Sequence, residues 1–192
     1  LFTDERQMNV QVFVDFSASM GKDNSDKASY TTAAAAALGF LAVQNMDRVT
    51  FHIMKGEKAE NPYGSIVGKQ AFFRAVSTLT EVQFEGDTDI EKCVTGCPEV
   101  TVNNGLSVIV SDFFTESNWK KAVDYLCYKK RQVLLIQVLS PEEAEPMYDG
   151  RMNLIDSEST DPADFRNMKL RITKSMLDSY NKALKDYTDD MR

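Results

Sequence analysis

One carboxylate and two hydroxyls stand at alternate positions near the start of the chain, directly after a short apolar run. Asp15, Ser17 and Ser19 follow the β-branched and aromatic residues 12–14, and Gly21 comes next. Such a run is typical of a buried strand, and ligands bind at the carboxyl ends of strands in open α/β sheets. One carboxylate and two hydroxyl oxygens suit a hard cation. The three side chains therefore predict a Mg²⁺ site.

A helix-capping turn is the alternative interpretation of the same residues. Ser and Asp are among the commonest N-cap residues, so their presence before a helix needs no metal. Capping uses only one such residue, however, and gives no reason for Gly21. We therefore favour the metal site.

Three segments resemble the metal-site motifs of von Willebrand factor A (vWA) domains, which carry a metal-ion-dependent adhesion site. Residues 15–21 read Asp-Phe-Ser-Ala-Ser-Met-Gly and resemble the family's Asp-x-Ser-x-Ser-Met-Gly motif. Residues 86–88 resemble its threonine loop, and residues 108–112 resemble its later strand that ends in aspartate. The resemblance implies one Mg²⁺ or Mn²⁺ site formed by Asp15, Ser17, Ser19, Thr88 and Asp112.

Several neighbours of these residues leave alternatives open. Thr88 could instead cap the helix expected after it, and Asp87 or Asp89 can act as an acceptor behind the metal ligands. Asp112 is expected to act through a water or as such an outer acceptor, and Ser111 is expected to be structural. Three aromatic side chains stand close by in the sequence. Phe16 is expected in the core, whereas Phe114 fits the core and an exposed rim equally well; Trp119 is expected to pack its helix on the sheet.

Alternating strand and helix patterns predict the elements that position this site. Strands are expected at residues 10–15, 49–54, 106–110 and 132–139. Helices are expected at residues 26–45, 69–79, 89–96 and 117–130, and the polar stretch 55–68 is expected to be loop with a short edge hairpin. Alternation at this spacing predicts a three-layer α/β/α sandwich around a mostly parallel sheet, which is the Rossmann-like vWA architecture.

The tail reads differently from the core. Residues 152–158 and 168–172 alternate in polarity and predict an edge hairpin with its turn at residues 160–164. An apolar face then predicts a terminal helix; its members are Met176, Leu177, Tyr180, Leu184 and Tyr187. We expect a single vWA-like domain over residues 1–192, with its core at about 8–140 and the hairpin and helix at about 150–190.

The tail also narrows the resemblance. Residues 140–143 (Ser-Pro-Glu-Glu) and 154–159 (Leu-Ile-Asp-Ser-Glu-Ser) resemble the bacterial family named domain of unknown function fifty-eight, over about residues 5–185. Members of that family are often encoded beside MoxR-type AAA+ ATPases. The resemblance therefore implies a protein partner of that type.

Composition excludes several classes of partner. The net charge is −7 and no basic cluster is present, which argues against nucleic acid and anionic membranes. The longest apolar stretch, residues 32–43, is too short to span a bilayer. A cytoplasmic location is expected, although the chain begins at Leu1, so a longer protein with an upstream membrane anchor is compatible with it.

The cysteines are expected to be reduced. Their number, three, argues against a disulfide framework and for a reducing compartment. Cys93 and Cys97 stand one helical turn apart and could share a metal, but the single histidine, His52, is far from them in sequence. Small buried thiols are the favoured interpretation.

Two classes of function remain. The first is a metal-dependent binding module, in which a partner's Asp or Glu completes the cation's coordination. The second is a metal-dependent phosphatase or phosphotransferase, which needs an aspartate nucleophile, usually a second aspartate two residues on, and a lysine. Here Ser17 occupies that second position and no lysine ends a core strand. We therefore predict a binding module that is not an enzyme.

Overall fold

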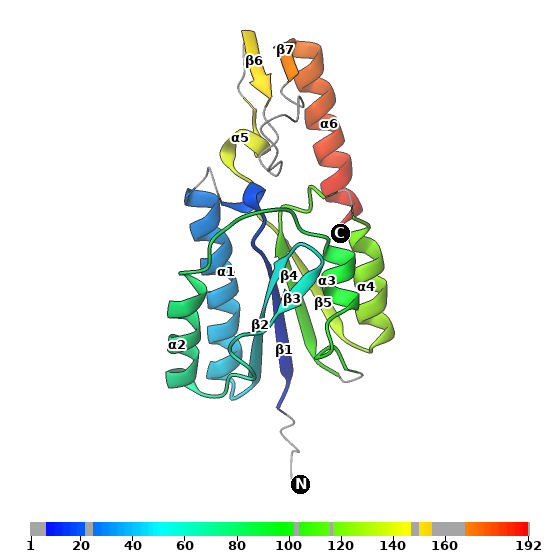
Figure 1. Ribbon diagram of the computed structural model, residues 1–192. Helices are drawn as coiled ribbons and strands as arrows, with labels where there is room; N and C mark the ends of the chain where they lie inside the picture. The colour runs from blue at the N-terminus through cyan, green and yellow to red at the C-terminus, as the bar shows by residue number, and fades with distance from the viewer. Residues whose placement is uncertain are drawn as a thin grey trace. The chain divides into compact units, whose positions relative to one another are not determined.

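Five strands form the central sheet of the computed structural model, which describes residues 7–21, 25–101, 104–115, 117–146, 150–154 and 168–191 (Figure 1). The sheet order is β3-β2-β1-β4-β5. Four strands run parallel: β1 (Asn9–Asp15), β2 (Arg48–Lys55), β4 (Leu106–Ser111) and β5 (Gln132–Gln137). The edge strand β3 (Lys58–Glu60) is antiparallel to β2, as the expected edge hairpin requires. Because β1 lies between β2 and β4, its carboxyl end meets the ends of both neighbours.

Helices cover both faces of the sheet, which confirms the three-layer architecture. Figure 1 shows α1 (Ser25–Gln44) and α2 (Lys69–Leu79) together on one side. On the other side lie α3 (Ile90–Thr95) and α4 (Trp119–Tyr128). A 3-10 turn, η1 (Ala18–Met20), directly follows β1. These elements match the expected ones to within a few residues at their ends.

The two faces of the sheet differ in chemistry. Successive side chains of a strand point to opposite faces, so β1 presents its valines to α1 and α2 and its other residues to α3 and α4. The first face belongs to an apolar core with Phe51 and Phe72. The second face carries buried polar side chains along three strands: Gln11, Asp15, Thr50, His52, Ser107 and Ser111.

Helix α1 approaches the sheet closely at Gly39. A β-carbon at this position would lie 2.7 Å from Cζ of Phe51 and 2.9 Å from Cε2 of Phe72. The missing side chain therefore makes room for two aromatic rings of the core.

Residues 139–192 form a second compact unit, separate from residues 1–138. It contains α5 (Pro141–Ala144), the antiparallel pair β6 (Gly150–Leu154) and β7 (Met168–Ile172), and α6 (Lys174–Asp190). A capping box at Ser140 begins α5, and the hydroxyl of Tyr180 on α6 donates to the carbonyl of Glu143 at 2.8 Å.

The hairpin and terminal helix expected in the tail are thus present, but the hairpin's expected position is wrong. Among the described strands, β6 and β7 pair only with each other, so they form their own two-stranded sheet rather than an edge of the main one. Alternation within each strand predicts pairing but contains no information on which sheet a strand joins. The expected turn at residues 160–164 and the segment 155–158 lie outside the described residues.

Candidate metal centre

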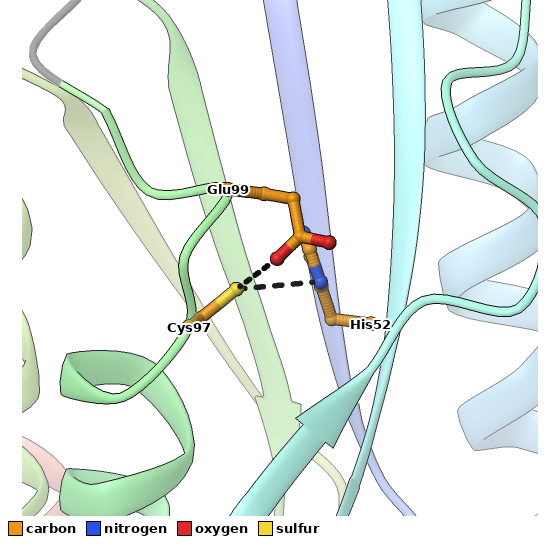
Figure 2. Close-up of side chains that lie close together, drawn as sticks. All are labelled: His52, Cys97 and Glu99. Atoms are coloured by element: carbon orange, nitrogen blue, oxygen red, sulfur yellow. Dashed lines mark hydrogen bonds between the residues drawn. The ribbon is translucent and has the colours of Figure 1, made fainter.

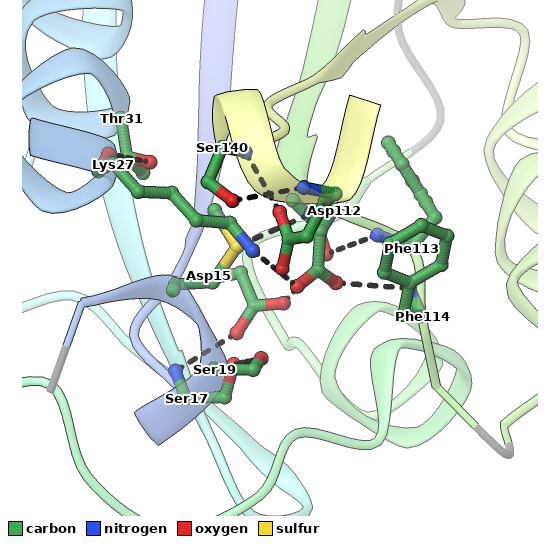
Figure 3. A network of polar contacts seen from close by, with 12 residues as sticks. Asp15, Ser17, Ser19, Lys27, Thr31, Asp112, Phe113, Phe114 and Ser140 are labelled. Atoms are coloured by element: carbon green, nitrogen blue, oxygen red, sulfur yellow. Dashed lines mark hydrogen bonds and ion pairs between the residues drawn. The ribbon is translucent and has the colours of Figure 1, made fainter. Parts of the chain in front are cut away.

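The first three predicted ligands meet where β1 ends and η1 begins (Figure 3). Asp15 is the last residue of β1, and its Oδ1 accepts a hydrogen bond of 2.9 Å from the backbone N–H of Ser17. The chain then turns, which places Oγ of Ser17 3.1 Å from Oγ of Ser19. Asp15 and Ser17 are buried, and Ser19 is half-buried. The turn therefore brings both hydroxyls together beside the carboxylate.

The threonine loop is bound to this turn through its backbone. The N–H of Ala18 donates to the carbonyl of Gly86 at 2.8 Å. Oγ1 of Thr88 lies 3.4 Å from the carbonyl oxygen of Met54, and the N–H of Phe16 donates to the same oxygen at 3.1 Å. Thr88 and Phe16, which are 72 residues apart in the chain, therefore bind the same carbonyl oxygen at the end of β2.

The capping alternative for Thr88 is wrong. Asp89 is the N-cap of α3, and its Oδ1 accepts a hydrogen bond of 3.0 Å from the N–H of Lys92. Its other oxygen, Oδ2, pairs with the ammonium of Lys92 at 3.3 Å. Since Asp89 caps the helix, the hydroxyl of Thr88 does not act as the cap; it lies instead at the edge of the sheet, near the carbonyl oxygen of Met54.

Asp112 lies directly after β4 and forms a buried ion pair with Lys27 of α1. Nζ of Lys27 lies 2.8 Å from Oδ2 of Asp112, and the two side chains are 1% and 4% exposed. The other oxygen, Oδ1, accepts a hydrogen bond of 2.9 Å from the N–H of Phe114. Both oxygens of Asp112 thus have protein partners, which agrees with an outer place for this residue around a cation.

Ser111 contacts the site directly. Its hydroxyl donates to Oδ2 of Asp15 at 2.6 Å and accepts a hydrogen bond of 3.0 Å from the N–H of Phe113. The expectation that Ser111 is structural is incomplete, because this serine holds the carboxylate of Asp15 in place. Together with the N–H of Ser17, it gives each oxygen of Asp15 a hydrogen bond from the protein.

Burial sets the electrostatics of Asp15. Its pKa is raised above the ordinary value of 3.8, chiefly because burial removes the carboxylate from water, and the negative charge of Asp112 raises it further. The hydrogen bonds from Ser111 and Ser17 act in the opposite direction. An ionised Asp15 is therefore unfavourable without a nearby positive charge, and a cation at this edge would supply one.

The donor set fits a small hard cation. All five predicted residues offer oxygen atoms, which Mg²⁺ and Mn²⁺ prefer to nitrogen or sulfur. Octahedral Mg²⁺ with bonds of 2.0–2.1 Å places adjacent ligand oxygens about 2.9 Å apart. The separation of 3.1 Å between Oγ of Ser17 and Oγ of Ser19 is close to that edge. The two serine hydroxyls would therefore fit adjacent positions around such an ion without a large rearrangement of the turn.

The aromatic residues around the site divide into core and surface. Phe16 is fully buried and stacks on Phe84 with ring centroids 4.5 Å apart, which confirms its expected place. Phe113 is also fully buried and meets Trp119, at the start of α4, edge to face. Phe114 is 41% exposed. The open question over Phe114 is therefore resolved in favour of an exposed position beside Asp112.

Sequence reasoning missed Lys27, although a weak signal was present. Lys27, Thr31 and Ala35 recur every four residues on α1 and are all buried, so they form one stripe of the helix facing the sheet. Lysine is almost never fully buried without a partner. A lysine on the buried stripe of a helix thus predicts an acidic partner, but its identity requires the fold.

The fold and the motif-bearing sheet edge define a protein of the vWA-like α/β class. An aerotolerance-related membrane protein from Bacteroides fragilis shares this fold with a TM-score of 0.56; the match covers 93% of this chain and 88% of that one at 16% identity. The chain belongs to the family described as protein of unknown function DUF58, which matches residues 1–185.

Similar curated proteins occur in mycobacteria. Uncharacterized proteins of Mycobacterium tuberculosis and Mycobacterium bovis are 28% identical over 160 residues, which cover 81% of this chain and 50% of each relative. The chain thus spans about half the length of these relatives. Among the described residues, no helix combines the length and hydropathy needed to cross a membrane.

Proposed function

We propose that this chain is a metal-ion-dependent protein-interaction module that binds a carboxylate of a partner protein through Mg²⁺ or Mn²⁺. The observation that carries the proposal is the convergence of Asp15, Ser17 and Ser19 on one turn at the carboxyl end of the central strand. Thr88 and Asp112 come to the same edge from two other segments. The bound ion would offer an open position to an anionic ligand.

The charges around the site favour an anion as that ligand. Asp15 and Asp112 contribute two negative charges when ionised, whereas Lys27 contributes one positive charge. A divalent cation would therefore leave the site with a net positive charge. The remaining donors, Ser17, Ser19 and Thr88, are neutral hydroxyls that do not offset it.

The rest of the chain is acidic and would repel an anionic partner elsewhere. With a net charge of −7, the surface favours a partner carboxylate only at the cation. Phe114 is exposed beside the site and offers an apolar contact next to it. Binding should therefore require the divalent ion and be abolished by a chelator.

The partner we propose is a MoxR-type AAA+ ATPase, or a protein that such an ATPase remodels. This part rests on the genomic association that the family resemblance implies. We place the module in the cytoplasm, and an anchor elsewhere in a longer protein is compatible with that location. The residues of this chain set only the chemistry of the contact, which is an Asp or Glu side chain.

Calorimetric titration with Mn²⁺ tests the cation site. Wild type should bind one equivalent, with modest affinity because few carboxylates contribute. Asp15→Ala and the double variant Ser17→Ala/Ser19→Ala should lose this binding. Asp124→Ala, which removes an exposed carboxylate from α4, is the matched control and should bind as wild type does. Equal binding by Asp15→Ala would overturn the assignment of the site.

Co-purification tests the partner. The tagged chain should retain the host's MoxR-type ATPase in Mg²⁺ and release it in chelator, and Ser17→Ala/Ser19→Ala should not retain it. A partner recovered equally with the double variant and in chelator would show that the cation site is not the contact.

The expectation that no lysine ends a core strand is wrong, because Lys55 is the last residue of β2, where its ammonium pairs with Glu85. A metal-dependent phosphatase is the second candidate, because the structure also brings a lysine of α1 to this edge of the sheet. Lys27 reaches the carboxyl edge of the sheet from α1 and could neutralise a phosphate there. The second aspartate is still missing, since Ser17 stands two residues after Asp15. Hydrolysis of p-nitrophenyl phosphate in Mg²⁺ separates the candidates: turnover lost in Asp15→Asn would favour the enzyme.

A further inference from the structure

Three side chains with metal-binding atoms meet on the polar face of the sheet (Figure 2). His52 lies on β2 and is fully buried, and its ring stacks on Phe13 with centroids 4.5 Å apart. Cys97 and Glu99 come from the loop that follows α3. The cluster combines an imidazole, a thiol and a carboxylate from segments 45 residues apart. None of these residues belongs to the adhesion-type site.

Two of the three distances within the cluster match the edges of a zinc tetrahedron. Sγ of Cys97 lies 3.6 Å from Nδ1 of His52 and 3.3 Å from Oε2 of Glu99. The three ligand atoms all lie within 4.8 Å of one another. With Zn–S near 2.3 Å and Zn–N or Zn–O near 2.0–2.2 Å, a tetrahedral site separates sulfur from each lighter ligand atom by about 3.5 Å. Both measured distances are within about 0.2 Å of that value.

We propose that His52, Cys97 and Glu99 form a second metal site, selective for a divalent transition metal of the zinc type. Thiolate and imidazole ligands favour Zn²⁺ over Mg²⁺, so this site would not compete for the ion of the oxygen-lined site. Three protein ligands leave the fourth tetrahedral position for a water. The exposed side chain of Glu99 gives the ion a route from solvent.

The surroundings of the imidazole keep it in the form that binds metal. Burial lowers the pKa of His52 to about 4, so the ring is neutral at neutral pH. Burial also raises the pKa of Cys97 to about 12, and the hydrogen bond to Glu99 adds to that effect. The thiol is therefore protonated without metal, and a bound cation would displace its proton.

Two buried polar atoms on this face also lack hydrogen-bond partners among the described residues: Nε2 of His52 and Oε1 of Gln11. They belong to adjacent strands, β2 and β1, and face the same side of the sheet. A histidine that binds metal through Nδ1 carries its proton on Nε2 and usually donates it to an oxygen. The amide oxygen of Gln11 on the neighbouring strand is an acceptor of that kind, although it does not bond to Nε2 in this structure.

Cobalt substitution tests the proposal with a signal that reports sulfur ligation directly. Co²⁺ bound through a thiolate gives an intense charge-transfer absorption in the near ultraviolet, whereas Co²⁺ bound by oxygen alone does not. The reduced chain, held in excess Mg²⁺ to fill the oxygen-lined site, should develop this band with one equivalent of Co²⁺. One equivalent of Zn²⁺ should then abolish the band by displacement.

Variants assign the ligands. Cys97→Ser should abolish the band. Glu99→Gln, a change at an exposed side chain that leaves the fold intact, should weaken Co²⁺ binding by more than about tenfold. Mutation of a residue that only hydrogen-bonds a metal ligand already lowers metal affinity by about 10–100-fold. Cys127→Ser removes an exposed thiol and should keep the wild-type spectrum. Cys93→Ser should also keep it, because Sγ of Cys93 donates to the carbonyls of Gly56 and Lys58.

Any one of the following results would overturn the proposal. A wild-type chain without the charge-transfer band would show that the cluster is only a hydrogen-bonded group. A band that survives Cys97→Ser, or that disappears in Cys127→Ser, would assign the thiolate to another cysteine. Unchanged affinity in Glu99→Gln would remove the carboxylate from the site.

Discussion

Replacing Lys27 by methionine should destabilise the metal-free protein strongly and should strengthen its response to divalent cations. Methionine keeps most of the aliphatic stem but removes the ammonium that lies 2.8 Å from Asp112. The two side chains are only 1% and 4% exposed, so the remaining carboxylate would stay buried without its partner. Breaking a buried pair in this way costs about 3–5 kcal/mol.

Divalent cations should recover part of that loss. At a concentration 100 times the dissociation constant, a ligand stabilises the native state by about 2.7 kcal/mol. The variant should gain more than wild type at the same Mn²⁺ concentration, because the lost ammonium no longer repels the ion. Each tenfold gain in affinity adds about 1.4 kcal/mol. Urea unfolding followed by the fluorescence of Trp119, the only tryptophan, measures both effects in residues 1–138.

Two further variants test the role of the Lys27 ammonium. Lys121→Met breaks an exposed pair with Glu91 and should cost less than about 1 kcal/mol. The double variant Lys27→Met/Asp112→Asn should lose less stability than the sum of the losses in the two single variants, because it leaves no buried charge without its partner. If Lys27→Met unfolds like Lys121→Met and responds to Mn²⁺ like wild type, the ammonium does not share the site.

Three other predictions follow from the remaining contacts. Because the pKa of His52 is lowered to about 4, the unfolded chain takes up this proton first as the pH falls below 6.5. The free energy of unfolding should therefore decrease by about 3 kcal/mol between pH 6.5 and 4. In the presence of chelator, the urea midpoint of His52→Gln should lack this pH-dependent decrease. Gly39→Ala places a methyl group 2.7 Å from Phe51 and 2.9 Å from Phe72, so overpacking should cost about 1–3 kcal/mol in thermal or urea unfolding. Phe114→Ala, at an exposed ring, should leave Mn²⁺ binding unchanged and weaken capture of the partner; equal capture would exclude this residue from the interface.

The sheet and its helices were predictable because local patterns determine them. The apolar run that ends at Asp15 and the pattern of residues 69–79 each contain enough local information to set type and boundaries. The order of the motifs also places Thr88 and Asp112 at the same sheet edge as Asp15. These inferences need only the rule that parallel strands share their carboxyl ends.

Contacts between distant side chains were not predictable in the same way. Lys27 and Asp112 are 85 residues apart, and no local pattern pairs them. His52 and Cys97 are 45 residues apart in the sequence, but the loop after α3 brings Sγ of Cys97 to 3.6 Å from Nδ1 of His52. Neighbours of this kind depend on how loops cross a face, which hydrophobic periodicity does not describe.

Arg131 affects the geometry at the opposite end of the sheet from its own position. Its guanidinium donates to the carbonyls of Asn9 and Leu106 and to the hydroxyl of Ser107, so it joins the starts of β1 and β4 just before β5 begins. Parallel strands have no hairpin turn to fix their alignment, and a slip of one residue would turn every side chain to the wrong face. This buried guanidinium therefore helps to fix the register between β1 and β4. The 2.6 Å contact between Ser111 and Asp15 lies six residues after Asn9 on β1 and five residues after Leu106 on β4, so it depends on the register that Arg131 helps to fix.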